Sequence, residues 1–261
     1  MNTRMVLFFI FLVCTCACVF KSNCDPPSTN FKELVMRSGG TWRDAPLPIL
    51  YINLERRKDR LTHITKMLSG YPNTAMVKRI DAVEGRDLLD ETIFLGCKLK
   101  NRGEKGCFLS HVKAWKAVLK AKIDTALILE DDVVLEYECQ MPILQNLVDV
   151  ANAQGAWDVI ALGYLNIYQN YFQTTNLKID SSHVLGYLKN NHYLPSGMAY
   201  VIKKSTIRKL LLNLSRGKGV CNPVDHYISD EIHKNKIYAI VPPLFTQTGV
   251  TSDIQPHSTI D

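Results

Sequence analysis

A regular alternation between short apolar runs and longer segments of helical periodicity constrains the fold most, and it begins at Ile49. Buried strands are predicted at six runs: PILYINL, TAMVKRIDAV, TALILE, WDVIALG, GMAYVI and KIYAIVPPL. Helices are predicted between and after them, at residues 56–70, 104–122, 141–153, 204–214 and 223–235. Strands that alternate with helices predict an α/β fold with a mostly parallel central sheet and helices on both faces.

The N-terminal segment is expected to direct the chain into a membrane system. Residues 5–20 are uncharged and apolar. This stretch is long for the apolar region of a signal peptide and slightly short for a spanning helix. We expect residues 1–21 to be a cleaved signal peptide or an uncleaved signal-anchor; a buried helix of the domain is the less favoured alternative. Residues 22–48 are predicted to form a stem, and residues 49–255 are predicted to form the folded domain. We expect this domain to lie in the ER or Golgi lumen, to be anchored to the membrane, or to be secreted.

Composition and charge narrow the class of protein. The chain has 261 residues, 46% of them hydrophobic, which is enough to fill a large α/β core. The formal net charge of +6 comes from scattered Lys and Arg, a pattern that favours a solvated basic surface over nucleic-acid binding and suits an anionic small-molecule substrate. An odd number of cysteines follows the leader, so the sequence allows a disulfide such as Cys97–Cys107 or, equally, buried free thiols.

Three adjacent carboxylates, Glu130, Asp131 and Asp132, interrupt the apolar stretch TALILEDDVVLE. They follow a predicted strand, and ligands of open α/β sheets bind at the carboxyl ends of strands. Adjacent carboxylates repel one another, so a cation or several hydrogen-bond donors must collect them. Oxygen ligands of this kind suit Mn²⁺ or Mg²⁺, ions that commonly share their ligands with substrate phosphates. The stretch therefore predicts a metal-diphosphate site; an exposed acidic turn is the alternative.

Further polar residues are predicted at the same sheet edge. Asn53 ends the first strand, and its carboxamide could pair with a base edge or a ribose. Arg56 and Arg60 share one helix face close to this strand end, and Asp81 ends the second strand. For each of these residues a plain structural role, a solvated helix surface or a turn, is an equal alternative.

Eight blocks in order, from ILYINLERRKDR through GEKGCFLSHVKAW, ALILEDDVVL and PVDHYI to PPLFTQTGVTSDI, resemble glycosyltransferase family 25, the lipopolysaccharide-biosynthesis and collagen β-galactosyltransferase group. The resemblance spans about residues 49–254. It implies a GT-A-like fold, a UDP-sugar donor carrying galactose or glucose, Mn²⁺ or Mg²⁺ at the acidic motif, and inversion at the anomeric carbon. The implied acceptor is a glycan, a lipopolysaccharide-like molecule or a protein side chain of the hydroxylysine type.

The resemblance also implies roles for single residues. Asp132 is expected to bind the metal, with Glu130 as a second ligand or as a partner of the ribose. Asp131 is expected beside the nucleotide sugar, together with the residues of the first two strand ends, Asn53, Leu54, Arg56, Arg60 and Asp81. An inverting transfer needs one general base, for which we choose Asp225 in PVDHYI over Asp230, Glu231 and Asp253. The region 163–194 matches no pattern, which leaves the acceptor open.

Two other functions stay open from the sequence. A glycoside hydrolase also uses two carboxylates but gives no reason for three adjacent acids or for the Arg-rich first helix. A catalytically silent module that binds sugar or a partner on the same fold would not need the EDD and PVD stretches to remain intact.

Overall fold

The structure is a computed structural model, and it describes residues 47–71, 76–88, 101–135, 143–216 and 222–247. These lie within the compact unit Pro46–Asp261. The predicted leader and most of the predicted stem lie outside the described residues. Among the helices that are described, none is both long and apolar enough to cross a membrane.

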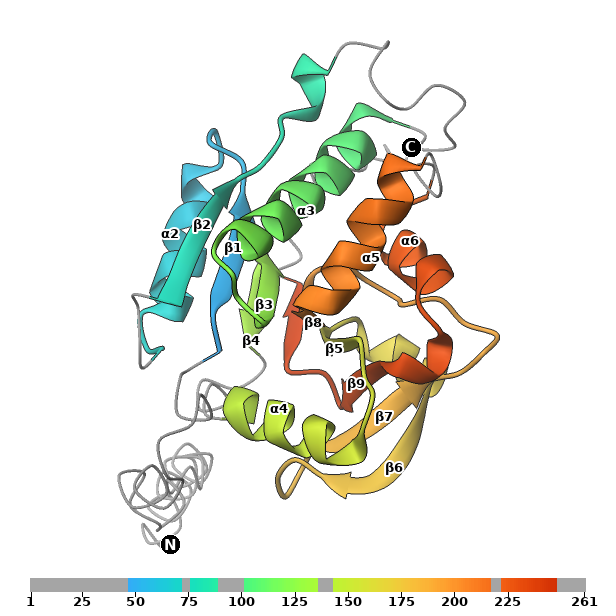
Figure 1. Cartoon of the computed structure of the whole chain (residues 1–261). Helices are drawn as coiled ribbons and strands as arrows, with labels where there is room; N and C mark the ends of the chain where they lie inside the picture. Colours follow the sequence, from blue (N-terminus) through green and yellow to red (C-terminus); the bar gives the residue numbers. More distant parts are fainter. Residues whose placement is uncertain (1–46, 72–75, 89–100, 136–142, 217–221, 248–261) are drawn as a thin grey trace, which may run out of the picture. The chain divides into compact units, whose positions relative to one another are not determined.

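A 10-stranded sheet forms the centre of the domain (Figure 1). Its main path runs β2-β1-β3-β8-β5-β9-β7-β6, and β10 joins β4 to β5 beside it. The strands are β1 (Ile49–Asn53), β2 (Val77–Asp81), β3 (Thr125–Glu130), β4 (Val133–Leu135), β5 (Val159–Gly163), β6 (Phe172–Lys178), β7 (Val184–Leu188), β8 (Ala199–Lys203), β9 (Ile237–Val241) and β10 (Phe245–Gln247).

Most strands of this sheet point the same way. β1 pairs in parallel with β2 and β3, and β5 pairs in parallel with β9 and β10. β8 is antiparallel to both β3 and β5, β7 is antiparallel to β9, and β4 is antiparallel to β10. The predicted α/β class with a largely parallel central sheet is therefore confirmed, with β4, β7 and β8 running in the opposite direction.

Helices cover both faces of the sheet, as predicted (Figure 1). α3 (Arg102–Lys120), α5 (Lys204–Ser215) and α6 (Val224–Glu231) pack on one face, and α2 (Lys58–Leu68) and α4 (Ile143–Gln154) pack on the other. Neighbouring residues of one strand enter opposite cores: Ile128 packs with the first group, while Leu127 and Leu129 pack with the second. This division follows from the two-residue period of a strand.

The helices begin and end near the predicted residues because their apolar faces meet the sheet. In α3, Phe108, Trp115 and Val118 are buried at helical spacing, and the N-cap Asn101 accepts a hydrogen bond from the Glu104 backbone N–H at 2.8 Å. Three short 3₁₀ turns, η3 (Gly85–Asp87), η5 (Asn166–Tyr171) and η6 (Lys234–Lys236), complete the described elements.

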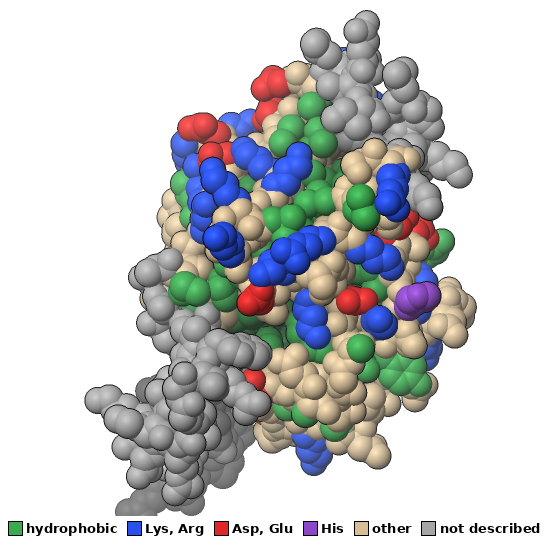
Figure 2. All heavy atoms as spheres, viewed as in Figure 1, with side chains coloured by type: hydrophobic (Ala, Val, Ile, Leu, Met, Phe, Trp, Pro, Cys, Tyr) green, Lys and Arg blue, Asp and Glu red, His purple; other side chains and the backbone are tan. Residues whose placement is uncertain are grey.

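The exposed charges also follow the prediction. Lys and Arg side chains are spread over the face that carries α3, α5 and α6, with Asp and Glu between them (Figure 2). No single block of positive charge is visible on this face. This distribution agrees with a solvated basic surface.

Candidate active site

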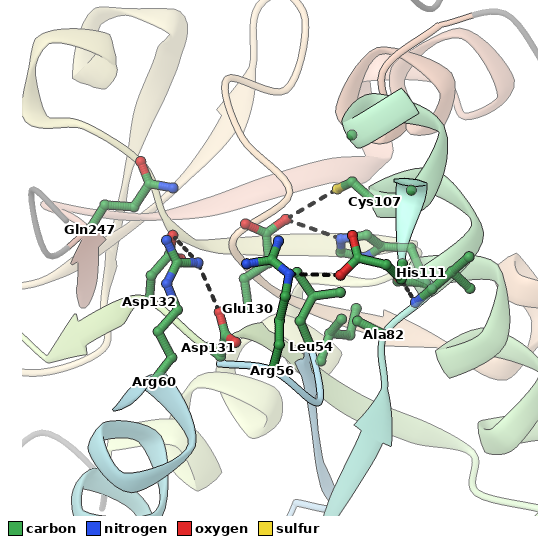
Figure 3. A pocket seen from close by; sticks show the side chains of 16 residues that line it. Leu54, Arg56, Arg60, Ala82, Cys107, His111, Glu130, Asp131, Asp132 and Gln247 are labelled. Atoms are coloured by element: carbon green, nitrogen blue, oxygen red, sulfur yellow. Dashed lines mark hydrogen bonds and ion pairs between the residues drawn. The ribbon is translucent and has the colours of Figure 1, made fainter. Parts of the chain in front are cut away.

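The acidic triplet lies in the turn between β3 and β4, at the edge of the sheet where β1, β2 and β3 end. A pocket opens there between the loop after β1, the loop after β2 and the first turns of α3 (Figure 3). Gln247 lies on one side of the triplet, and Cys107 and His111 lie on the other. The predicted convergence of strand ends on one site is therefore present in the structure.

Asp131 and Asp132 are buried beside a single guanidinium. Nη1 of Arg60 lies 3.0 Å from Oδ1 of Asp131 and 3.1 Å from Oδ2 of Asp132. Asp131 also accepts a hydrogen bond from Nδ2 of Asn53 at 2.7 Å. Burial raises the pKa of Asp131, while its bonds to Asn53 and Arg60 act in the opposite direction. These contacts make Asp131 the residue that fixes the turn.

Asp132 has unused capacity to bind a cation. Its Oδ1 atom is buried and has no hydrogen-bond partner among the described residues. Burial, followed by the charge of Glu130, raises the pKa of Asp132 to about 6. Asp132 lies next to two more acids and has few hydrogen bonds and little positive charge around it. Such a carboxylate is a hard oxygen ligand of the kind that Mn²⁺ and Mg²⁺ prefer. The chemistry of Asp132 therefore suits a divalent metal, whereas the described ligand atoms that lie within 4.8 Å of one another belong to Cys107, His111 and Glu130.

Glu130 is held on the far side of the turn. Its Oε1 lies 3.2 Å from Nε2 of His111, and the thiol of Cys107 donates to the same oxygen at 3.7 Å. Nδ1 of His111 lies 2.8 Å from the hydroxyl of Tyr200, which also accepts a bond from Nε1 of Trp115 at 2.9 Å. The side chain of Glu130 keeps 19% exposure to the pocket. Its second carboxylate oxygen is the one left to serve the predicted metal or a ribose.

Five predicted nucleotide-binding residues line the pocket: Leu54, Arg56, Arg60, Glu130 and Asp131. Nε of Arg56 pairs with Oε2 of Glu84 at 2.7 Å, and the Arg56 side chain is 34% exposed. Arg60 is largely buried and faces the acidic turn. These two cations stand on the loop and helix that follow β1, so they face the site from the side opposite α3 (Figure 3).

Two other predicted residues are not at the pocket wall. Asn53 is fully buried; its amide donates to Asp131 and to the Arg57 carbonyl, and its oxygen accepts from Nε of Arg79 at 3.0 Å. In this structure Asn53 supports Asp131, and its predicted contact with a base or ribose stays a prediction. Asp81 is not among the residues that line the pocket; its side chain is 64% exposed and pairs with Arg79 at 2.9 Å.

The sequence prediction missed several wall residues. Cys107 has a free thiol, and both burial and the charges of Glu130 and Asp225 raise its pKa. Its spacing of four residues from His111 on α3 was the available signal. Gln247 comes from β10, a three-residue strand too short to recognise by periodicity.

The predicted base, Asp225, lies in the first turn of α6 and borders a second, neighbouring pocket. Its Oδ1 accepts a hydrogen bond from the backbone N–H of His226 at 2.9 Å. Burial raises the pKa of Asp225, and the charge of Glu130 acts in the same direction. Asp225 and Glu130 are near enough to interact electrostatically, but they line two separate pockets. Asp253, the alternative base, lies outside the described residues.

Sequence comparison connects this site to known proteins. A profile of glycosyltransferase family 25 (LPS biosynthesis protein) matches residues 47–228. The mouse protein named procollagen galactosyltransferase 2 is 32% identical over 44% of this chain and 20% of its own length. A glycosyltransferase 25 family member of Anopheles gambiae is 30% identical over 69% of this chain and 31% of its own. A rat relative, 30% identical over 44% of this chain and 22% of its own, is named a probable inactive glycosyltransferase 25 family member 3.

Among solved structures, a glycosyltransferase involved in the glycosylation of the major capsid of PBCV-1 has 10% identity and a TM-score of 0.47, covering 80% of this chain and 95% of its own. The chain spans about a fifth to a third of the length of the curated relatives named above. The profile match contains the acidic turn, both arginines and Asp225. The chain therefore belongs to glycosyltransferase family 25.

Proposed function

We propose that the chain is a metal-dependent, inverting glycosyltransferase that moves galactose or glucose from a UDP-sugar to a hydroxyl of a glycan, glycolipid or protein acceptor. The single observation that carries this proposal is Asp132, a buried carboxylate with one unpartnered oxygen, in an acidic turn at the open edge of the sheet. Family membership and the names of the relatives support the reaction class.

The two arginines place guanidinium groups at a pocket that also holds four carboxylates, Glu84, Glu130, Asp131 and Asp132. Arg56 is partly exposed at the pocket wall, and Arg60 holds Asp131 and Asp132 in place. Guanidinium groups bind phosphate oxygens through paired N–H donors. Glu130 and Asp132 would hold Mn²⁺, which when bound stabilises the negative charge that develops on a diphosphate leaving group. The donor is thereby oriented between the acidic turn and the first turns of α3.

Asp225 accepts the proton of the acceptor hydroxyl. Inversion requires attack from the face opposite the leaving group, and Asp225 borders the compartment next to the donor pocket. Its raised pKa makes Asp225 a stronger base than an exposed aspartate. The proton passes from the hydroxyl to a carboxylate oxygen of Asp225 as the hydroxyl oxygen bonds to the anomeric carbon.

The proposal is tested by UDP-sugar hydrolysis and transfer assays with Mn²⁺, using UDP-galactose, UDP-glucose and other UDP-sugars. We expect Asp132→Asn to lose about 10²-fold or more of the metal-dependent rate, by analogy with the loss of one charge-stabilising group. Asp59→Asn is the matched control, because Asp59 is exposed, lies outside the pocket and pairs only locally with Arg57. Full activity of Asp132→Asn, or activity that a strong chelator leaves unchanged, would refute a metal-diphosphate site.

A silent binding module is the second candidate, and the relative named as probably inactive is the observation that favours it. This candidate predicts that the protein binds UDP-sugars but does not turn them over with water or with any acceptor tested. Measuring UDP affinity and turnover on the same preparation separates it from an enzyme.

A further inference from the structure

A second pocket beside Asp225 has walls made mostly of aromatic rings. It lies where η5 and the loop before β8 meet the first turn of α6. The residues that matter for its chemistry are Tyr168, Tyr171, His192, Tyr193, His226 and Asp225. Region 163–194, which contains most of these rings, matched no pattern in the sequence, and the donor pocket uses none of them.

The rings form ordered pairs. Tyr171 stacks on His192 with centroids 4.0 Å apart and an interplanar angle of 17°, and Tyr193 stacks on His226 at 4.5 Å and 18°. Each pair joins residues from different segments, so the stacking closes the pocket from two sides. Tyr193 keeps 44% exposure although it is a large ring. An exposed aromatic surface of this kind in a concave site indicates ligand binding.

The backbone around the rings is fixed before any ligand binds. The Leu194 N–H donates to the Ser229 hydroxyl at 2.7 Å, the His192 N–H donates to the Lys189 carbonyl at 3.1 Å, and Lys234 Nζ donates to the His192 carbonyl at 2.6 Å. These bonds tie the loop to α6, to the residues after β7 and to η6. A preformed wall lowers the entropic cost of binding.

The charges restrict which ligand fits. Asp225 carries the carboxylate of this pocket, and it disfavours an anionic group. The ammonium of Lys234 lies 4.1 Å from the centroid of Tyr193, so it already uses a face of that ring and disfavours a second ammonium. With anions and ammonium groups disfavoured, the pocket suits a neutral ligand. Such a ligand would place an apolar face against the rings and would hydrogen-bond through its hydroxyls to Asp225, to the Tyr hydroxyls and to the imidazole nitrogens.

We propose that this aromatic pocket is the acceptor subsite and that it binds a neutral pyranose of a glycan. A pyranose presents C–H groups on its faces and hydroxyls around its edge, which match the rings and the polar groups of this pocket. The proposal rests on the proposed function, because it treats the other compartment as the donor pocket.

The two pockets are near enough for one reaction. A Cβ atom at Gly197 would lie 2.8 Å from Cγ1 of Val224 and 3.7 Å from the His111 ring, so the chain before β8 passes between α6 and α3. Asp225 follows Val224 directly, and His111 contacts Glu130 of the donor pocket. Val224, next to Asp225, and His111, next to Glu130, therefore approach each other across Gly197.

Saturation-transfer NMR with a panel of neutral methyl pyranosides, including galactosides, glucosides and mannosides, tests the subsite directly. We expect at least one glycoside to bind the wild-type protein and Tyr193→Ala to weaken it by about tenfold, or roughly 1.4 kcal/mol, because the Tyr193 ring packs against His226 and Lys234 in the pocket wall and offers its exposed part to the ligand. Tyr193→Phe keeps the ring and should retain most of the binding. Tyr187→Ala is the matched control, because Tyr187 is 39% exposed on β7 and lies outside the pocket.

The affinity for UDP is measured on the same variants and is expected to be equal in all of them. Absence of binding by every pyranoside, or equal binding by wild type and Tyr193→Ala, overturns the subsite. Binding of lysine amide or a lysine peptide in place of pyranosides also overturns it, in favour of a protein acceptor. Failure of the donor assay while pyranosides bind at Tyr193 contradicts the proposed function alone, so the two failures are distinguishable.

Discussion

At the scale of single residues, Asp132 is the group in the donor pocket whose charge is least compensated. Its pKa of about 6 lies above the value of about 3.9 for an unfolded aspartate, so the folded state binds the proton more tightly. The free energy of unfolding therefore falls as the pH rises through the window between these two values. A functional carboxylate here costs stability whenever no cation accompanies it.

Removing this charge should stabilise the metal-free protein. We expect Asp132→Asn to raise the free energy of unfolding at neutral pH by on the order of 1–2 kcal/mol, since the lost repulsion exceeds the lost attraction to Arg60. The gain should disappear near pH 4, where Asp132 is already protonated. Thermal unfolding at the two pH values measures it. Asp59→Asn should show no gain, because hydrogen bonding to Arg57 lowers the pKa of Asp59; stabilisation of both variants alike would contradict the assignment.

Asp225 gives a kinetic prediction. We expect Asp225→Asn to lower kcat by roughly 10² to 10⁴ while the affinity for UDP stays nearly constant, because Asn can still accept from the His226 N–H but cannot take a proton. In the wild type, kcat should fall as the pH drops through the raised pKa of Asp225, and this acid limb should be absent from the variant. The pH profile of kcat checks both statements.

Asp230→Asn is the control for that experiment, since Asp230 is exposed on the same helix and bonds Asn222. It should behave as wild type. Wild-type turnover in Asp225→Asn would move the role of base to Asp253.

At the scale of elements, the approach of η3 to α3 shapes the donor pocket. A Cβ atom at Gly85 would lie 2.1 Å from the Arg102 carbonyl oxygen, and one at Gly106 would lie 2.8 Å from the Val83 carbonyl oxygen. These two glycines allow the loop after β2 to lie against the first turns of α3, where Gly103 and Cys107 line the pocket.

We expect Gly85→Ala to destabilise the fold by about 1–3 kcal/mol and to weaken UDP binding, because the methyl group would push α3 away from the pocket. Gly70→Ala is the matched control, with nothing within 4 Å of its Cβ position, and should be neutral or stabilising by about 0.4–1 kcal/mol. Denaturant unfolding and UDP titration of the two variants measure both effects. Equal behaviour of the variants would show that the close contact is not needed.

The elements also show what periodicity could and could not reveal. β1, β3, β5, β8 and β9 are almost fully buried, so their apolar runs identified them from the sequence. β6 (FQTTNLK) is largely exposed and polar, and β4 and β10 have three residues each, so local sequence carries little signal for them. The acidic turn and the arginines were predictable from strand ends; the aromatic pocket was not, because tertiary packing alone brings η5, the loop before β8 and α6 together.

At the scale of the whole molecule, the start of the folded domain can be tested. Leu47 is buried, its carbonyl accepts from the Tyr71 hydroxyl at 2.6 Å, and the Pro48 carbonyl accepts from the Leu127 N–H at 2.9 Å. The folded domain thus includes at least the two residues before Ile49, the predicted start. The predicted leader, residues 1–21, and most of the predicted stem, residues 22–48, lie outside the described residues, and we propose that they serve to place the domain in the secretory pathway.

A protein that begins at Pro46 is therefore expected to be soluble, monodisperse and active. One that begins at Ile49 loses the two hydrogen bonds and the burial of Leu47, worth roughly 1.5–3 kcal/mol for the side chain alone, and should unfold at a lower temperature. Size-exclusion chromatography and thermal unfolding compare the two. An insoluble product from Pro46 would show that the leader belongs to the domain.

The reversed strand β8 has a consequence for how such a transferase can diversify. Because β8 runs against β3, its first residue Ala199 sits beside Leu129, and the Glu130 N–H donates to the Met198 carbonyl at 2.8 Å. The loop that leads into β8 and the acidic turn that follows β3 therefore lie at the same edge of the sheet. The loop before β8 can change length and composition without altering the strand that carries the acids. If the proposed donor and acceptor sites are right, the donor chemistry would depend on a strand exit and the choice of acceptor on a strand entry, so the two could vary separately.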